Sequence, residues 1–258
     1  AIAILIGLLI GAVVIFISNS SEALDGLRTL LAGPVEDGML GIGRVLYYAV
    51  PIIMTGLSVG FAFKTGLFNI GTPGQFIIGA FAAVYVGVKW TFLPGSIHWL
   101  VAILAAFAAG GLWAVIPGVM KAYLNVNEVI SSIMMNYIGM YLVNYSVSLV
   151  LFDALRNQSL PVASTAVIPK MGFDKIFTGS PANGGFVIAI LFVILIYIIL
   201  NKTSFGYEMK ACGFNKDASK YAGINEKRNI ILSMVIVGAR YGVGGALLDL
   251  ANAGKYMQ

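Results

Sequence analysis

The sequence is poor in charge and nearly free of cysteine. Only 10% of its 258 residues are Asp, Glu, Lys or Arg, whereas about a quarter of a typical soluble domain is charged. With a mean hydropathy of +0.91 and recurrent apolar runs near the roughly 20 residues that cross a bilayer, it predicts an all-α polytopic membrane protein. The single cysteine, Cys212, excludes an internal disulfide. The net charge of +5 indicates membrane orientation rather than a nucleic-acid partner.

Two further absences limit the mechanism. The first six apolar stretches hold no Asp, Glu, Lys or Arg well inside them, although proton- and ion-coupled carriers usually keep ionisable residues at membrane depth. The chain also lacks the G-x-x-x-x-G-K-[ST] loop that cradles nucleotide phosphates. We therefore expect no catalytic residue, metal or cofactor in this chain, and expect ATP to be bound by a separate cytoplasmic subunit.

Apolar stretches of membrane-spanning length recur along the chain. Seven spans are predicted at about 1–17, 45–63, 66–88, 97–120, 129–152, 186–200 and 230–250. With the N-terminus in the cytoplasm, eight Lys and Arg residues fall on short inner loops and six on longer outer loops, which favours this orientation. The first span has no basic segment before it, so a retained helix is favoured over a cleaved signal peptide. His98, beside Trp99, is predicted to be an interfacial residue rather than a metal ligand.

The third span contains GLFNIGTPGQFIIGAF and is unusually polar. Gly71, Pro73 and Gly74 weaken a helix, and Pro73 removes a backbone donor, so a broken helix is predicted here. Broken helices often form the substrate site of a transporter, and Asn69 and Gln75 suit a path for a neutral polar solute. The alternative interpretation is a kinked helix whose glycines allow close packing.

A polar stripe runs along the fifth span. Every fourth residue belongs to it: Ser132, Asn136, Met140, Asn144 and Ser148. Because a step of four residues exceeds a helical turn by about 40°, the stripe winds slowly around the helix. It must meet either a water-filled path or another helix, and both interpretations stay open.

The longest inner loop, 201–229, predicts a short rigid helix. Asn215 can cap it, Gly223 can end it in the left-handed conformation, and Asp217 stands three residues before Lys220. Such an element between two spans could transmit motion from an ATPase. The alternative is a solvated basic loop that only sets topology.

Three motifs carry a family resemblance. GLFNIGTPGQFIIGAF, NEVISSIMMNYI and KACGFNKDASKYAGIN, in this order and at these separations, resemble permease subunits of bacterial ABC importers for nucleosides and simple sugars. The resemblance covers about residue 45 to the end. It implies one permease domain over 1–258, incomplete against a ten-helix inverted-repeat permease, in the bacterial plasma (inner) membrane. The implied partners are a second permease, a double-headed ATPase and a substrate-binding lipoprotein.

The resemblance also implies site residues. It places Asn69, Gln75, Glu128 and Asn136 near the substrate path, to which the polar stripe adds Ser132 and Asn144. It places 206–225 on the coupling region, whose candidate ATPase contacts are Glu208, Asn215, Lys216, Asp217, Lys220, Tyr221 and Gly223. The competing function class is a secondary carrier or channel for a neutral polar solute, independent of an ATPase.

The last span departs from the expected pattern. It carries Arg240 within GARYGVGG, and a charge at this depth costs about 2.5 kcal/mol or more on insertion scales. Asp249 is the candidate partner within the same span, although a bend or a second helix would be needed to bring the two together.

Overall fold

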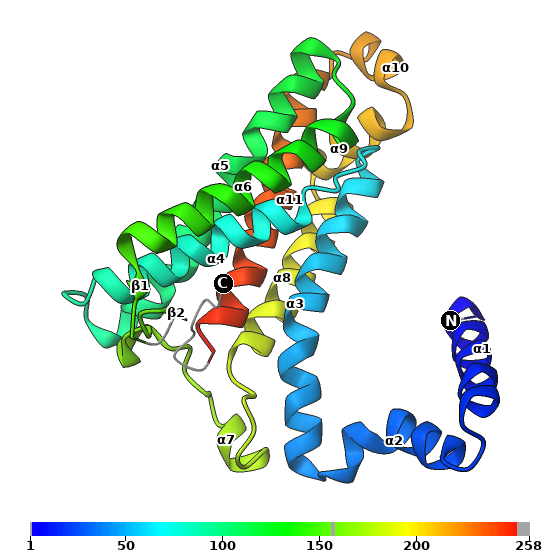
Figure 1. The fold of residues 1–258 in the computed structure, drawn as a ribbon. Coiled ribbons are helices and arrows are strands. Elements are labelled where there is room, and N and C mark those ends of the chain that lie inside the picture. Colours follow the sequence, from blue (N-terminus) through cyan, green and yellow to red (C-terminus); the bar gives the residue numbers. More distant parts are fainter. Residues whose placement is uncertain (1, 156–157, 252–258) are drawn as a thin grey trace.

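The computed structural model describes residues 2–155 and 158–251, and this part of the chain is mostly helical with very little sheet (Figure 1). The helices are α1 (Ile2–Ser18), α2 (Ala23–Glu36), α3 (Met39–Lys64), α4 (Thr72–Lys89), α5 (Gly95–Leu124), α6 (Glu128–Val150), α7 (Phe173–Ile176), α8 (Gly185–Lys202), α9 (Ser204–Phe214), α10 (Lys216–Tyr221) and α11 (Glu226–Asp249). A 3-10 turn, η1 (Ser164–Ala166), and a two-residue antiparallel pair, β1 (Phe152–Asp153) and β2 (Gln158–Ser159), complete the elements.

Each of the seven predicted spans coincides with one helix: α1, α3, α4, α5, α6, α8 and α11. Five of them, α3, α5, α6, α8 and α11, are long and apolar enough to cross a membrane by length and composition. The prediction of an all-α polytopic membrane protein is thereby confirmed. The span boundaries shift by a few residues, most at the starts of two helices: α3 begins at Met39 rather than near residue 45, and α4 begins at Thr72 rather than near residue 66.

Helix α11 forms the centre of the bundle and packs against α3, α4 and α5. Its small residues make this possible, because helices in lipid approach closely only where side chains are small. A Cβ atom added to Gly242 would collide with the carbonyl oxygen of Ala106 and lie 3.2 Å from the Cα of Gly110. A Cβ atom on Gly245 would lie 2.5 Å from the carbonyl oxygen of Phe76. Glycine is therefore required at both positions by close backbone contact.

The third span is interrupted differently from the prediction. Helix α3 ends at Lys64, residues 65–71 are not helical, and α4 begins at Thr72 with Pro73 in its first turn. Pro73 thus opens a helix, where its missing N–H has no intrahelical partner to lose. The interruption is the non-helical stretch 65–71 and not a kink at Pro73.

The two ends of the bundle differ in character. The stretch 65–71, the α5–α6 turn, α9 and α10 gather at one end, here called the α10 end, while α2, α7 and the β1–β2 pair lie at the other (Figure 1). The loops predicted to face the cytoplasm from their Lys and Arg content all fall at the α10 end. Helix α1 stands apart from the bundle and α2 links it to α3 (Figure 1).

His98 is not the interfacial residue expected from its neighbour Trp99. The imidazole is completely buried, with Nε2 3.1 Å from the carbonyl oxygen of Val86 and Nδ1 2.8 Å from Oγ1 of Thr165. It joins α5 to α4 and η1. The sequence pattern missed this role because both partners are distant in sequence.

Candidate functional site

Asn69 organises the non-helical stretch before α4. Its Oδ1 accepts a hydrogen bond from the backbone N–H of Gly71 at 2.7 Å and a longer one from Oγ of Ser132 at 3.4 Å. Its Nδ2 donates to Oε1 of Gln75 at 3.3 Å. All three side chains, of Asn69, Gln75 and Ser132, are buried. Three of the predicted path residues therefore satisfy one another in a hydrogen-bonded cluster.

Asn136 fastens α6 to the start of α4. Its Nδ2 donates to the carbonyl oxygen of Ile70 at 2.9 Å, and its Oδ1 accepts from the N–H of Gly74 at 3.0 Å. The N–H groups in the first turn of a helix have no intrahelical acceptor, so Asn136 supplies one. A Cβ on Gly74 would lie 2.8 Å from the Cα of Asn136, which explains why glycine stands there.

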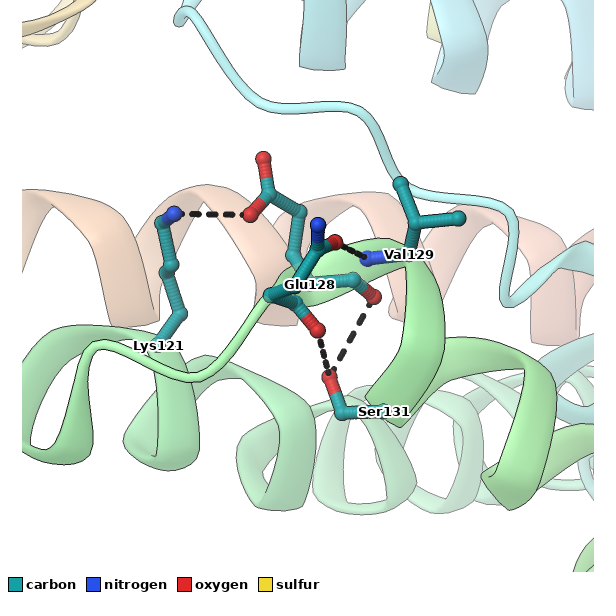
Figure 2. Close-up of polar contacts among 5 residues, drawn as sticks. Lys121, Glu128, Val129 and Ser131 are labelled. Carbon is teal, nitrogen blue, oxygen red and sulfur yellow. Dashed lines mark hydrogen bonds and ion pairs between the residues drawn. The ribbon is translucent and has the colours of Figure 1, made fainter.

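Glu128 locks the α5–α6 turn. Its carboxylate pairs with Nζ of Lys121 at 2.8 Å, and both side chains are largely shielded (Figure 2). Asn127 caps α6 by accepting from the N–H of Val129 at 2.9 Å, and Oγ of Ser131 donates to the carbonyls of residues 127 and 128. The α5–α6 turn is thus held by a shielded ion pair and by a capped first turn of α6.

Together these contacts define a polar clamp, formed by Asn69, Gln75, Glu128, Ser132 and Asn136, at the α10 end of α4, α5 and α6. Helix packing through hydrogen bonds, one of the two interpretations of the stripe, accounts for Ser132 and Asn136. The stripe winds as predicted from its spacing: Ser132 is buried, Asn136 and Asn144 are half-buried, and Ser148 is exposed. A role in solute passage stays a prediction for all six residues, Asn144 included.

The loop between α8 and α11 folds into two helices, α9 and α10. The predicted cap is present: Oδ1 of Asn215 accepts from the N–H of Ala218 at 2.9 Å, and Gly223 ends the turn with a φ of 80°. Phe214 and Tyr221, at either end of α10, are 91% and 95% exposed. Tyr221 is among the predicted coupling residues, whereas Phe214 is not, because the loop holds several aromatic residues and residue type alone does not set Phe214 apart.

The seven predicted coupling residues do not share one environment. Asp217, Lys220 and Tyr221 are exposed, whereas Lys216 is half-buried. Glu208 points back towards α11, where its Oε2 accepts from Nδ2 of Asn229 at 3.5 Å. Asn215 and Gly223 act as the two ends of α10.

A cavity of about 250 Å³ lies beneath these helices at the α10 end. It is lined by parts of 65–67, α5, α9, α10 and α11, including Lys121, Cys212, Lys216, Asn229 and Ser233. Oδ1 of Asn229 is buried without a hydrogen-bond partner within the described ranges.

Arg240 does not use Asp249 as its partner. In the part of the chain that the structure describes, its Nε donates to the carbonyl of Ile236 and its Nη1 to that of Leu57, both at 3.2 Å. The guanidinium lies 4.5 Å from the ring centroid of Phe61, a cation–π arrangement. Arg240 is buried and joins α11 to α3. Its partners are backbone carbonyls and a ring, which charge counting along the sequence does not reveal.

Comparison with known proteins defines the class. Residues 41–256 match the family described as "Branched-chain amino acid transport system / permease component", and the chain belongs to this family of membrane permeases. Permease components of this kind are not themselves catalytic.

Individual relatives show which transporters within this family the chain is similar to. The chain is 40% identical over 251 residues to the guanosine ABC transporter permease protein NupP of Bacillus subtilis, covering 97% of this chain and 71% of that protein. It is 33% identical to the nucleoside ABC transporter permease protein NupB of Lactococcus lactis, covering 100% and 70%. It is 30% identical to the glucose ABC transporter permease protein TsgB13 of Haloferax volcanii, covering 83% and 57%. No solved structure matches the chain.

Proposed function

We propose that this chain is the transmembrane permease subunit of an ATP-driven importer that moves nucleosides, or related simple sugars, into the bacterial cell. The observation that carries the proposal is the 40% identity, over nearly the whole chain, to a permease named for guanosine. The chain acts as one permease domain, and the loop 201–229 is its coupling region. The polar clamp positions α4 and α6 on either side of the non-helical stretch.

The proposed partners follow from this class. A cytoplasmic ATP-binding subunit docks at the α10 end, a second permease subunit completes the membrane domain, and a substrate-binding lipoprotein delivers solute from outside. The N-terminus lies in the cytoplasm of a chain held in the plasma (inner) membrane. The excess of Lys and Arg on the loops at the α10 end supports this orientation.

A labelling experiment tests the orientation. Ser164→Cys lies in η1 on an exposed residue and should react with an impermeant thiol reagent added to intact cells, in a Cys212→Ser background. The unmodified chain, whose single cysteine is Cys212, should not react. The opposite pattern would invert the proposed topology.

Helix α10 is the proposed coupling element. It packs on α9, which in turn contacts α3, α8 and α11, so displacement of α10 by an ATPase would reach three spanning helices. Phe214 and Tyr221 present exposed rings, and buried aromatic anchors carry much of the binding free energy at protein interfaces. Asp217 and Lys220 add exposed charge on the same short helix.

Reconstitution tests the function directly. The complex of permeases, ATPase and binding lipoprotein is reconstituted in proteoliposomes. Complexes whose ATPase faces the lumen should accumulate labelled guanosine only when ATP is enclosed in the vesicles. A complex whose ATPase is inactivated should show no accumulation. Guanosine uptake that is unchanged without ATP hydrolysis would favour the secondary carrier instead.

A matched pair of cap variants tests the coupling role. Asn215→Ala removes the cap of α10, while Asn225→Ala removes the equivalent cap of α11, where Asn225 accepts from the N–H of Arg228 at 3.0 Å. Losing a cap costs about 1 kcal/mol of helix stability, enough to unfold a six-residue helix but not a 24-residue one. Asn215→Ala should keep basal ATP hydrolysis and lose its stimulation by solute, and Asn225→Ala should keep both.

Crosslinking locates the contact. Ser219 is buried and donates to the carbonyl of Asn215, so a reactive cysteine belongs at the exposed Lys220 instead. Lys220→Cys in a Cys212→Ser background should crosslink to the ATPase subunit. Absence of any crosslink in every nucleotide state would remove α10 from the interface.

A further inference from the structure

Three tyrosines lie on the face of α6 that points away from the rest of the chain. Tyr137, Tyr141 and Tyr145, here called the tyrosine face, are 60%, 68% and 64% exposed. They are four residues apart and therefore share one side of the helix. The opposite side, which includes Gly139, Val143 and Val147, is buried against α4 and α5.

The depth of Tyr141 is unusual for a tyrosine that faces lipid. It lies 13 residues after the start of α6 and nine before its end, or about 20 Å and 14 Å along the axis. Interfacial tyrosines belong at the edges of a hydrocarbon core about 30 Å thick. A hydroxyl without a partner at mid-depth is unfavourable, and no hydrogen bond to the Tyr141 hydroxyl is found within residues 2–155 and 158–251.

Helix α8 shows what a lipid-facing surface of this chain looks like. Its exposed residues at mid-depth are Ile190, Leu191, Ile194 and Leu195. Its one tyrosine, Tyr197, lies five residues from the end of the helix at Lys202. On α6 the exposed aliphatic residues Ile138 and Leu142 lie among the three tyrosines. The tyrosines at mid-depth are what distinguishes this surface from that of α8.

The tyrosine face also differs from the helix contacts inside the bundle. Around α11 the close contacts are made by small residues such as Gly238 and Gly242, as is usual for helices packed in lipid. Bulky rings at every fourth position keep a neighbouring helix at a distance. Ser148, on the same side of α6, is exposed as well, so the polar stripe runs out onto this face.

We propose that Tyr137, Tyr141 and Tyr145 line the solute path of the assembled importer and that the nucleobase of a transported nucleoside stacks on their rings. This inference rests on the proposed function. Aromatic side chains stack on any base because every base has a π-face. Successive tyrosines rise by about 6 Å, within the 4.5–7 Å over which ring centroids interact. A base that moves along α6 can therefore contact the following tyrosine ring while it is still in contact with the preceding one.

Accessibility to water provides the first test and does not depend on the solute. In a Cys212→Ser background, Tyr141→Cys should react with a small hydrophilic thiol reagent in the assembled complex. Ile194→Cys, at mid-depth on α8, should not react under the same conditions. A Tyr141→Cys variant as unreactive as Ile194→Cys would place this face in lipid or in a dry subunit contact and would overturn the proposal.

Transport provides the second test. Tyr141→Leu should lower guanosine and uridine uptake by about fivefold or more, the lower limit for loss of one base–aromatic stack. Tyr141→Phe keeps the ring and should retain most of the uptake. Tyr197→Leu on α8 is the matched control and should transport like the wild type.

The outcomes distinguish failure of the stacking role from failure of the proposed importer function. Unchanged uptake by Tyr141→Leu, in a complex whose wild-type form imports guanosine in an ATP-dependent way, would overturn the stacking role and leave the proposed function intact. Loss of the second permease from the purified Tyr141→Leu complex would also overturn it, because the face would then be a subunit contact. A wild-type complex that imports neither nucleoside would refute the proposed function itself.

Discussion

Helices α8 and α11 are both apolar spans, yet they occupy opposite environments. In α11, 78% of the 18-residue apolar stretch is buried in the bundle, whereas in α8 only 17% is buried. The more hydrophobic of the two, α8, is the one left outside. The difference lies in side-chain size: α11 carries glycines at 238, 242, 244 and 245, and α8 carries Ile, Leu and Val along most of its length.

The comparison of α8 with α11 shows that the most hydrophobic helix is not the one buried at the centre of this bundle. Lipid tails are as apolar as a leucine side chain, so burial of a large aliphatic residue against another helix gains little there. Small residues permit backbone contact and the dispersion interactions that come with it. Helix α11 is central because its glycines allow the backbones of neighbouring helices to approach closely.

The largest expected effect comes from adding volume to α11. Gly242→Val places a side chain against the backbone of Ala106 and Gly110, and we expect about 3 kcal/mol or more of destabilisation. Gly60→Val in α3 is the matched control, since nothing lies within 4 Å of a Cβ atom there. Thermal unfolding in detergent measures both. Equal unfolding temperatures for Gly242→Val and Gly60→Val would show that close backbone contact does not distinguish α11 from α3.

The next effect concerns the buried guanidinium that ties α11 to α3. Arg240→Ala removes two hydrogen bonds and a ring contact and leaves a cavity, so we expect about 2–3 kcal/mol of destabilisation. Arg240→Met fills the same space without a charge to desolvate and should retain most of the stability. If Arg240→Met unfolds as readily as Arg240→Ala, the charge itself and not its packing holds the helices together.

A smaller effect is expected at the polar clamp. Asn136→Leu leaves the N–H of Gly74 and the carbonyl of Ile70 without their partner, which should cost about 1–2 kcal/mol. Asn201→Leu on α8 makes the same chemical change where the amide is exposed. The Asn201 side chain donates to the carbonyl of Tyr197 in its own helix and accepts a long hydrogen bond of 3.5 Å from Nζ of Lys210. Its unfolding temperature should match that of the wild type. A similar loss in both variants would assign no special role to the clamp.

The smallest effects come from truncating one aliphatic side chain to alanine in each of the two helices. Val243→Ala in α11 truncates a fully buried side chain and should cost about 1 kcal/mol or somewhat more. Leu191→Ala in α8 truncates a side chain that is 58% exposed and should stay within about 0.5 kcal/mol of the wild type. An equal loss in the two variants would show that α8 is packed against a partner in the purified protein.

Local features were predictable where the cause is local. Asn215 and Gly223 were assigned as the ends of a helix from residue type and spacing alone, and the structure places them there. The drift of the polar stripe around α6 followed from helix geometry. Pro73 predicts a break within a helix, but it lies in the first turn of α4. A proline is compatible with both a helix break and a helix start, and the sequence does not show that the residues before it are non-helical.

Contacts between distant segments were not predictable in the same way. The partners of His98 and Arg240 are separated from them by 12 to 183 residues along the chain, apart from the carbonyl of Ile236. The tyrosine face is not recognisable from the sequence, because the spacing of the three tyrosines does not show which side of α6 is packed against the bundle. Polar side chains in a span can meet water, solute or another helix, and residue type does not distinguish these.

The sequence by itself determined that this protein lies in a membrane, that seven apolar segments form helices, and that a capped helix interrupts the loop before the last of them. These properties depend on hydrophobicity, backbone propensity and neighbours a few residues away. Only the tertiary structure decided that α11 is central, that the polar residues of the third and fifth spans bond one another, and that the tyrosine face is left uncovered. When helices are apolar on all sides, hydropathy does not show which side of a helix packs against another helix and which side faces lipid. Which helices pack together therefore depends on how closely their backbones can approach.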